Sequence, residues 1–172
     1  IVTNNHVVDG ADEITVKLTN DQKLKATVIG KDPSTDLAVL KIEATGLPYL
    51  EWGDSEALEI GEWVLAVGNP LDLEGTASEG IVSQKHRRIY KTALEDLLQT
   101  TAMINPGNSG GALVNLDGEL IGINMAIATN TGRWQGVGFA IPSGDAKWVA
   151  DSIIAHGRVI QGYIGVTMSS ET

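Results

Sequence analysis

The sequence predicts an all-β protein with one helix near its C-terminus. Short apolar segments separated by turn-forming residues recur over residues 14–120, which is typical of a β-sandwich or barrel. In contrast, residues 145–156 carry apolar side chains at helical spacing. A chain of 172 residues is long enough to form one large domain or two small halves.

The strands are expected in order along the chain. Residues 14–18 and 24–28 alternate apolar and polar side chains on either side of a turn at 19–22, which predicts two half-buried strands. Residues 37–42 form a largely continuous apolar run, and residues 63–67 form another, so each predicts a further strand.

The one helix is expected to run from about residue 145 to residue 156. Ser143 can cap its first turn, and Gly157 can end it in the left-handed conformation. Its apolar stripe is expected to pack against the second half of the molecule and consists of Ala146, Val149, Ala150, Ile153 and Ile154.

Composition argues against several classes of function. The formal net charge is −10, which repels phosphate backbones and makes a nucleic-acid partner unexpected. The three histidines lie far apart and the chain has no cysteine, so no metal site is expected. No phosphate-binding or dinucleotide motif is present, so no cofactor is expected either. No apolar stretch approaches the ~20 residues of a membrane helix.

Three residues with catalytic chemistry occur in the order His6, Asp36 and Ser109. A serine hydroxyl is a poor nucleophile unless a base lies beside it, and histidine titrates near neutral pH. A carboxylate can hold the imidazole in the tautomer that presents a lone pair to the serine. We therefore predict a catalytic triad in which Ser109 is the nucleophile, His6 the base and Asp36 the group that orients the base.

The chain order of the triad separates two possible folds. The run Gly-Asn-Ser-Gly-Gly at 107–111 also fits the nucleophile elbow of α/β-hydrolases, which run serine, acid, histidine and place a helix after the serine. Here the histidine comes first, and residues 112–123 form two apolar runs around an Asp-Gly turn, which favours a β-hairpin. Order and context favour a chymotrypsin-like serine protease, with an α/β-hydrolase esterase as an alternative.

The residues around the serine suit an oxyanion hole. The backbone N–H groups of Gly107 and Ser109, with that of Asn108 between them, are the expected donors to the oxyanion. Gly107 can take backbone angles that are closed to other residues. Taken singly, the serine run could be an ordinary turn, His6 a surface or core residue and Asp36 a turn cap; their joint occurrence in this order favours catalysis.

Several segments resemble the HtrA/Deg family of ATP-independent serine proteases over nearly the whole chain. The matching segments are 3–8, 32–41, 53–55, 67–70, 99–100, 104–115 and 138–142. The resemblance implies a chymotrypsin-like double β-barrel with one C-terminal helix and the triad in the cleft between the barrels. The family has strands before the histidine, so the first barrel is expected to be incomplete at its N-terminus and open-edged.

The resemblance also implies a division of the chain. It places an N-terminal barrel with His6 and Asp36 at residues 1–67, and a C-terminal barrel with Ser109 at residues 68–142. Residues 143–172 would form the helix and a linker toward a PDZ domain.

The same resemblance implies a function and further site residues. The family digests unfolded or misfolded proteins outside the cytoplasm, as in the periplasm, and builds on homotrimers. Arg87, in a sensor loop at 84–93, would be a regulatory residue, and 128–136 would be an activation loop. The substrate pocket would be apolar and would involve Ile104, Asn124, Met125, Ala126 and Ile127.

Two features leave alternatives open. Thr101 and Met103 stand where the family motif commonly has Asp and Ala, so the strand before the serine is expected to be looser. Ile104 can equally be a core residue, and Arg87 can lie in a solvated loop. The missing strands before His6 and the change at Thr101 leave an alternative function open, namely a truncated or resting protease domain that binds peptide or assembles without cutting.

Overall fold

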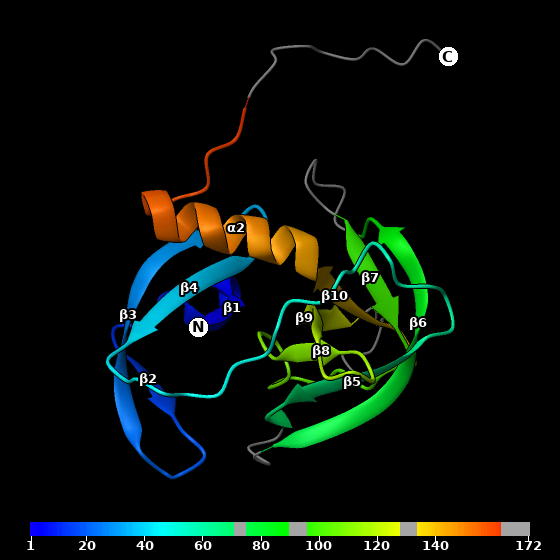
Figure 1. Ribbon diagram of the computed structural model, residues 1–172, viewed down its shortest axis with the longest axis horizontal. Helices are drawn as coiled ribbons and strands as arrows, with labels where there is room; N and C mark the ends of the chain where they lie inside the picture. Colours follow the sequence, from blue (N-terminus) through cyan, green and yellow to red (C-terminus); the bar gives the residue numbers. More distant parts are fainter. Residues whose placement is uncertain (71–74, 90–95, 128–133, 163–172) are drawn as a thin grey trace.

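The computed structural model describes residues 1–70, 75–89, 96–127 and 134–162. An open sheet and a closed barrel lie side by side, and one long helix crosses both (Figure 1). The elements in chain order are β1 (Val2–Asn4), α1 (Asn5–Val8), β2 (Ile14–Lys17), β3 (Lys23–Asp32), β4 (Leu37–Ile42), β5 (Trp63–Gly68), β6 (Thr76–Arg87), β7 (Leu97–Thr100), β8 (Ala112–Val114), β9 (Leu120–Ile127), β10 (Gly138–Pro142) and α2 (Ser143–His156).

The open sheet has the antiparallel strand order β1-β4-β3-β2. Its strand β4 is almost wholly apolar because both of its faces are covered. Alternate residues of a strand point to opposite faces. Accordingly, Ala38, Leu40 and Ile42 join the core of this sheet, whereas Leu37 and Val39 join a second cluster on the other face.

The barrel is closed, with the strand order β10-β7-β6-β5-β8-β9. Its interior is filled by small and branched side chains that are almost fully buried, among them Val64, Ala66, Val82, Leu113 and Ile121. Strand β5 belongs to this barrel, so the boundary expected after residue 67 is corrected: the two halves divide in the segment between β4 and β5. A mainly β fold with an incomplete first barrel is confirmed.

Helix α2 joins the two halves. It contacts β3 and β4 of the open sheet as well as β9 and β10 of the barrel, and Figure 1 shows it lying across both. The expected packing of the helix against the second half is confirmed, and the helix also packs against the first half. Its buried residues Ala146, Val149, Ala150 and Ile153 enter one cluster with Leu37 and Val39 of β4 and with residues of the barrel. We call this set the shared cluster.

The C-terminal end of α2 agrees with the sequence prediction, whereas its N-terminal end does not. Gly157 ends the helix at φ +71°, and its N–H donates to Ile153 O at 2.7 Å, as the sequence predicted. Ser143 does not cap the helix, because it lies inside it and its hydroxyl donates to Gly53 O at 2.7 Å. Ile154, expected on the buried stripe, is 66% exposed.

A pocket of about 410 Å³ lies beside the open sheet. It is lined by residues of β1, α1, β2 and β4 and by Ile1, Ala11 and Glu13, and it reaches Gly110 of the barrel half. Edge strands β1 and β2 have no further strand beside them among the described residues. Neither helix in the described ranges has the length and apolar character needed to cross a membrane.

Candidate active site

Strand pairing brings His6 and Asp36 together. Strand β1 ends at Asn4 and runs directly into the four-residue helix α1, which carries His6. Asp36 immediately precedes β4, and the register of the two strands pairs Asn4 with Leu37. His6 therefore follows the end of β1 at the point where Asp36 precedes the paired start of β4, which places the two residues side by side.

The Asp36 carboxylate holds His6 at two points. Its Oδ2 lies 2.6 Å from His6 Nδ1, and its Oδ1 accepts the main-chain N–H of His6 at 2.9 Å. An ionised carboxylate can only accept hydrogen bonds, so Nδ1 carries the proton. In the neutral ring, Nε2 then presents its lone pair away from Asp36, as a general base requires.

The backbone of Asp36 is fixed as firmly as its side chain. Its carbonyl oxygen accepts the Asn4 side-chain amide at 3.0 Å and the Asn5 main-chain N–H at 2.9 Å. Its φ of +56° lies in the left-handed region, which aspartate tolerates better than most residues. The preceding turn is braced by Asp32, whose carboxylate accepts the hydroxyls of Ser34 and Thr35 at 2.6 and 2.7 Å.

Residues 105–111, which we call the serine loop, begin with a tight turn. The N–H of Asn108 donates to Asn105 O at 2.9 Å, with Pro106 and Gly107 at the two central positions. Gly107 has φ +102°, the sign that a type II turn requires at its third position, and proline is common at the second. A side chain at Gly107 would lie 2.5 Å from Asn69 O, so only glycine fits here.

Two of the predicted oxyanion donors in the serine loop have a main-chain N–H that is not bonded to a described residue. Asn108 N–H is used within the turn, and those of Gly110 and Gly111 donate to Asn124 O and Asn108 O, each at 2.9 Å. The N–H groups of Gly107 and Ser109 have no acceptor among the described residues. Two of the three expected oxyanion donors are therefore free, while the expectation for Asn108 is corrected because its N–H is already bonded.

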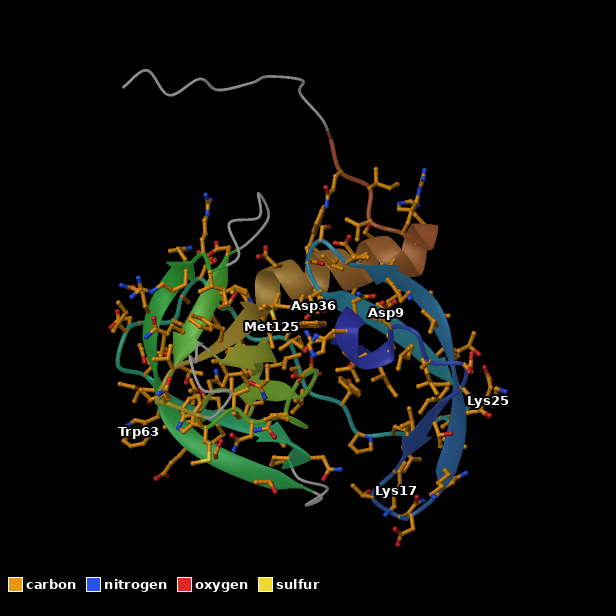
Figure 2. The ribbon with its side chains drawn as sticks, turned by 180° about the vertical axis from the view of Figure 1, so that it is seen from behind. Asp9, Lys17, Lys25, Asp36, Trp63 and Met125 are labelled. Carbon is orange, nitrogen blue, oxygen red and sulfur yellow. The ribbon has the colours of Figure 1, made fainter. Side chains whose placement is uncertain are left out.

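The serine loop lies against the segment that carries His6. A side chain added at Gly110 would come within 2.1 Å of Thr3 Oγ1, which shows how closely the loop approaches β1. The Ser109 hydroxyl itself donates to Met125 O of β9 at 3.1 Å. Figure 2 labels Asp36 and Met125 in the region where the two halves meet. Leu37, the residue after Asp36, belongs to the shared cluster, and Met125 packs against that cluster from the barrel half.

The predicted pocket residues differ in their placement. Ile104 is only 1% exposed and packs in the barrel core with Trp134, close to Gly138. Met125 is partly buried against the shared cluster. Asn124 is fully buried, and its side-chain amide bonds to strand carbonyls. Ala126 and Ile127 continue β9, and their side chains lie outside the described part of the structure.

The expected looseness before the serine is offset by Thr101. Its hydroxyl accepts the N–H of Ile81 at 3.0 Å, and its own N–H donates to Ile81 O at 3.1 Å. The neighbouring Thr100 hydroxyl also donates to Ile81 O, at 2.9 Å. Three hydrogen bonds thus tie this segment to β6 without the carboxylate of the family motif.

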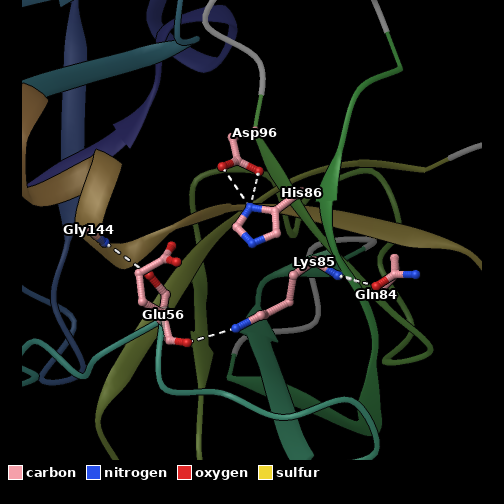
Figure 3. Close-up of polar contacts among 7 residues, drawn as sticks. Glu56, Gln84, Lys85, His86, Asp96 and Gly144 are labelled. Carbon is pink, nitrogen blue, oxygen red and sulfur yellow. Dashed lines mark hydrogen bonds and ion pairs between the residues drawn. The ribbon is translucent and has the colours of Figure 1, made fainter.

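The predicted regulatory residue lies at the end of β6. Arg87 Nε donates to Gln99 Oε1 of β7 at 2.9 Å. Beside it, His86 Nδ1 lies 3.0 Å from Asp96 Oδ2, and Lys85 Nζ donates to Glu56 O at 2.7 Å (Figure 3). Residues 90–93 of the sensor loop and residues 128–133 of the activation loop lie outside the described residues.

Two groups in this region have shifted pKa values. The hydrogen bond and charge of Asp96 raise the pKa of His86, with a smaller contribution from Glu56. Burial raises the pKa of Asp145 in the first turn of α2, and the charges of Asp96 and Glu56 raise it further. The negative charges of Asp96 and Glu56 therefore favour the protonated forms of His86 and Asp145.

Sequence reasoning named Asn124 as a pocket residue but did not anticipate the supporting roles of the two buried asparagines beside the site. Asn4 ties the Asp36 carbonyl, and Asn124 lies next to the carbonyl that accepts the Ser109 hydroxyl. A sequence signal existed for Asn124, because it is a polar residue within the apolar run 120–127. For Asn4, the only signal in the sequence was its position two residues before His6.

The family model of the trypsin-like peptidase domain matches residues 1–123. Among curated proteins, the chain is 50% identical over 169 residues to the "Probable periplasmic serine endoprotease DegP-like" of Chlamydia pneumoniae and 48% identical over 168 residues to that of Pseudomonas fulva. Each comparison covers 98% of this chain and 35% of the relative. The chain thus spans about a third of the length of these relatives.

Solved structures give the same result. The HtrA-type protease AlgW with a decapeptide is 48% identical and superposes with a TM-score of 0.94, covering 99% of this chain and 53% of that one. The serine endoprotease from Yersinia pestis is 45% identical, with a TM-score of 0.82, covering 96% of this chain and 57% of that one. The expected resemblance to HtrA/Deg proteases is confirmed, and the chain belongs to the trypsin-like peptidase domain family.

Proposed function

We propose that the chain is a serine endopeptidase domain in which Ser109, His6 and Asp36 form the catalytic triad. The observation that carries the proposal is the 2.6 Å contact between Asp36 Oδ2 and His6 Nδ1, on a segment that packs against the serine loop. Relatives named serine endoproteases support the reaction class.

The reaction follows from the roles of the three groups. Ser109 Oγ forms a bond to the scissile carbonyl carbon while His6 Nε2 takes its proton. The carbonyl electrons move to oxygen, and the N–H groups of Gly107 and Ser109 stabilise the resulting anion. Protonated His6 then gives its proton to the leaving amine, which departs and leaves an acyl-enzyme. Water repeats the two steps and releases the acid, and Asp36 stays ionised throughout.

The Ser109 hydroxyl is not yet in its reactive hydrogen bond. It donates to Met125 O, so its hydrogen must be redirected before His6 can accept the proton. Catalytic hydrogen bonds in ligand-free enzymes are often long or misaligned and tighten when substrate binds. We propose that a bound peptide induces this change of hydrogen-bond partner.

We further propose that the substrates are unfolded or misfolded polypeptides and that the domain acts in the periplasm, as part of a homotrimer. The relatives' names place those proteins in the periplasm, and the AlgW structure was determined with a decapeptide. The quality-control role and the trimer rest on the resemblance to HtrA/Deg proteases.

Hydrolysis of an unfolded protein such as reduced casein tests the proposal. Ser109→Ala should lower kcat by at least about 10³-fold, because the nucleophile is lost. Ser152→Ala is the matched control: its hydroxyl donates to Arg158 O, just beyond the C-terminal end of α2, and bonds to no triad residue. Turnover by Ser109→Ala equal to that of Ser152→Ala would contradict the proposal.

A second candidate function is a resting domain that binds peptide without cutting it. The hydrogen bond from Ser109 to Met125 O favours this candidate, since the hydroxyl donates to a main-chain carbonyl and not to the imidazole. Measuring casein binding beside casein cleavage separates the two candidates. Binding without any turnover supports the resting domain, and turnover excludes it.

A further inference from the structure

Asn124 is a fully buried polar residue in the otherwise apolar strand β9. Its side-chain nitrogen donates to Val67 O of β5 at 3.3 Å and to Ala112 O of β8 at 2.9 Å. Its Oδ1 has no partner among the described residues. A buried amide is costly unless it is hydrogen-bonded, so an apolar side chain would be the ordinary occupant of this position.

The two carbonyls that Asn124 bridges lie where two strands separate. Strands β5 and β8 pair Leu65 with Val114 and Ala66 with Leu113, and the ladder stops there. The next pair in that register would be Val67 with Ala112. The Asn124 amide therefore takes the place of the next rung and holds the two strands at a fixed separation beside the serine loop.

The backbone of Asn124 holds the C-terminal side of the serine loop. Its N–H donates to Gly111 O and its carbonyl accepts the N–H of Gly110, both at 2.9 Å. The next residue, Met125, accepts the Ser109 hydroxyl. The main chain of Asn124 and Met125 is thus hydrogen-bonded to each of the three residues from Ser109 to Gly111.

The side chain connects to the other end of the loop through β5. Two residues beyond Val67, Asn69 donates its N–H to Gly107 O at 3.1 Å, and its carbonyl oxygen packs against the Gly107 backbone. A change in the position of Val67 would therefore move Asn69, and with it Gly107. Asn124 thus contacts segments that hold the N–H groups of Gly107 and Ser109 in place.

We propose that Asn124 is a positioning residue for the oxyanion hole, rather than a wall of the substrate pocket. By fixing the separation of β5 and β8, its amide sets where the N–H groups of Gly107 and Ser109 point. The inference rests on the proposed function, because it assigns the residue a role in the same reaction.

Steady-state hydrolysis of a short peptide by Asn124→Ala tests the inference. The variant keeps the main-chain bonds of residue 124 but removes both side-chain donors. Misplaced donors stabilise the transition state less well but hardly affect substrate binding. We therefore expect kcat to fall about 10²-fold while KM changes less than about twofold. Asn124→Ser retains one donor and should show an intermediate kcat, which also serves if Asn124→Ala does not fold.

A peptide boronate supplies a readout that a general loss of stability would not change. The boronate forms a tetrahedral adduct that occupies the oxyanion site, so its affinity should fall in parallel with kcat. Ile123→Val is the matched control, because it removes one methylene from the neighbouring buried position and no hydrogen bond. It should retain kcat and boronate affinity at a comparable loss of thermal stability.

The outcomes separate the inference from the proposed function. A wild-type chain that does not hydrolyse peptide overturns both. An active wild type whose Asn124 variants keep kcat within about threefold overturns the positioning role alone. A rise in KM at unchanged kcat would also overturn it, since that result describes a residue that only binds substrate.

Discussion

Replacement of Asp36 by asparagine isolates the step in which the imidazole is oriented. The two oxygens of Asp36 are already assigned, because Oδ1 accepts the main-chain N–H of His6 and Oδ2 faces the ring nitrogen Nδ1. In Asp36→Asn, the amide oxygen must keep the main-chain bond, so the NH₂ group is directed at Nδ1. Nδ1 must then accept a hydrogen bond, and the ring proton moves to Nε2.

That tautomer cannot take the serine proton, so the expected effect is large. An aspartate-to-asparagine change with this consequence lowers kcat by about 10⁴-fold while leaving the geometry intact. The expected change in folding stability is small, since the shape of the side chain is preserved. The assay is hydrolysis of a peptide substrate near neutral pH, with thermal unfolding measured on the same samples.

Asp9→Asn provides the control for this change. Asp9 also lies beside α1, but its carboxylate pairs with Lys31 at 2.7 Å on the surface and does not contact the imidazole. It should keep wild-type kcat within about twofold. A loss smaller than about tenfold in a folded Asp36→Asn would refute the argument that this carboxylate sets the tautomer of His6.

Other changes test the fold, the serine loop and the two groups with raised pKa values, His86 and Asp145. Ile153→Ala should cost about 2–5 kcal/mol in urea unfolding because the side chain is fully buried in the shared cluster, whereas the exposed Ile154→Ala should stay within about 0.5 kcal/mol. Gly110→Ala should lower kcat/KM at least about tenfold, because φ is +80° and the new methyl would press on β1; wild-type activity would contradict that close approach. Asp145→Asn should stabilise the fold at neutral pH by less than about 1 kcal/mol, since the raised pKa disfavours the ionised form of a half-exposed group, and the gain should vanish below pH 3.8. The raised pKa of His86 makes its pairing with Asp96 fully stabilising below pH 6.5 and lost as pH rises through the raised value, so the wild type should lose its thermal-stability advantage over His86→Gln in that direction.

Periodicity predicted the parts of the fold in which burial follows a simple rule. The strand at 37–42 was predicted with its observed bounds, because both of its faces are covered. Helix α1 has four residues, too few to show a helical period. The 12 residues of β6 are interrupted by Gly80, where a side chain would lie 2.0 Å from Ala102 N. Such close strand contacts depend on tertiary packing that no local pattern encodes.

The residue types of the candidate site could be predicted from the sequence, but the contacts that hold these residues in place could not. The order of His6, Asp36 and Ser109 indicated the chemistry, whereas the strand register that brings the first two together is a long-range property of the folded sheet. The role of Asn124 depends on the separation of β5 and β8, which cannot be read from one sequence. Ser143 was misjudged because the acceptor of its hydroxyl, Gly53 O, lies 90 residues away.

The central claim is that His6, held by Asp36, activates the Ser109 hydroxyl across the boundary between the two halves. The most direct test is mass spectrometry of the chain after reaction with a fluorophosphonate, which bonds only to an activated hydroxyl. We predict a single adduct on Ser109 in the wild type and almost none in His6→Ala. Equal labelling of the two proteins, or an adduct on a different serine, would contradict the claim.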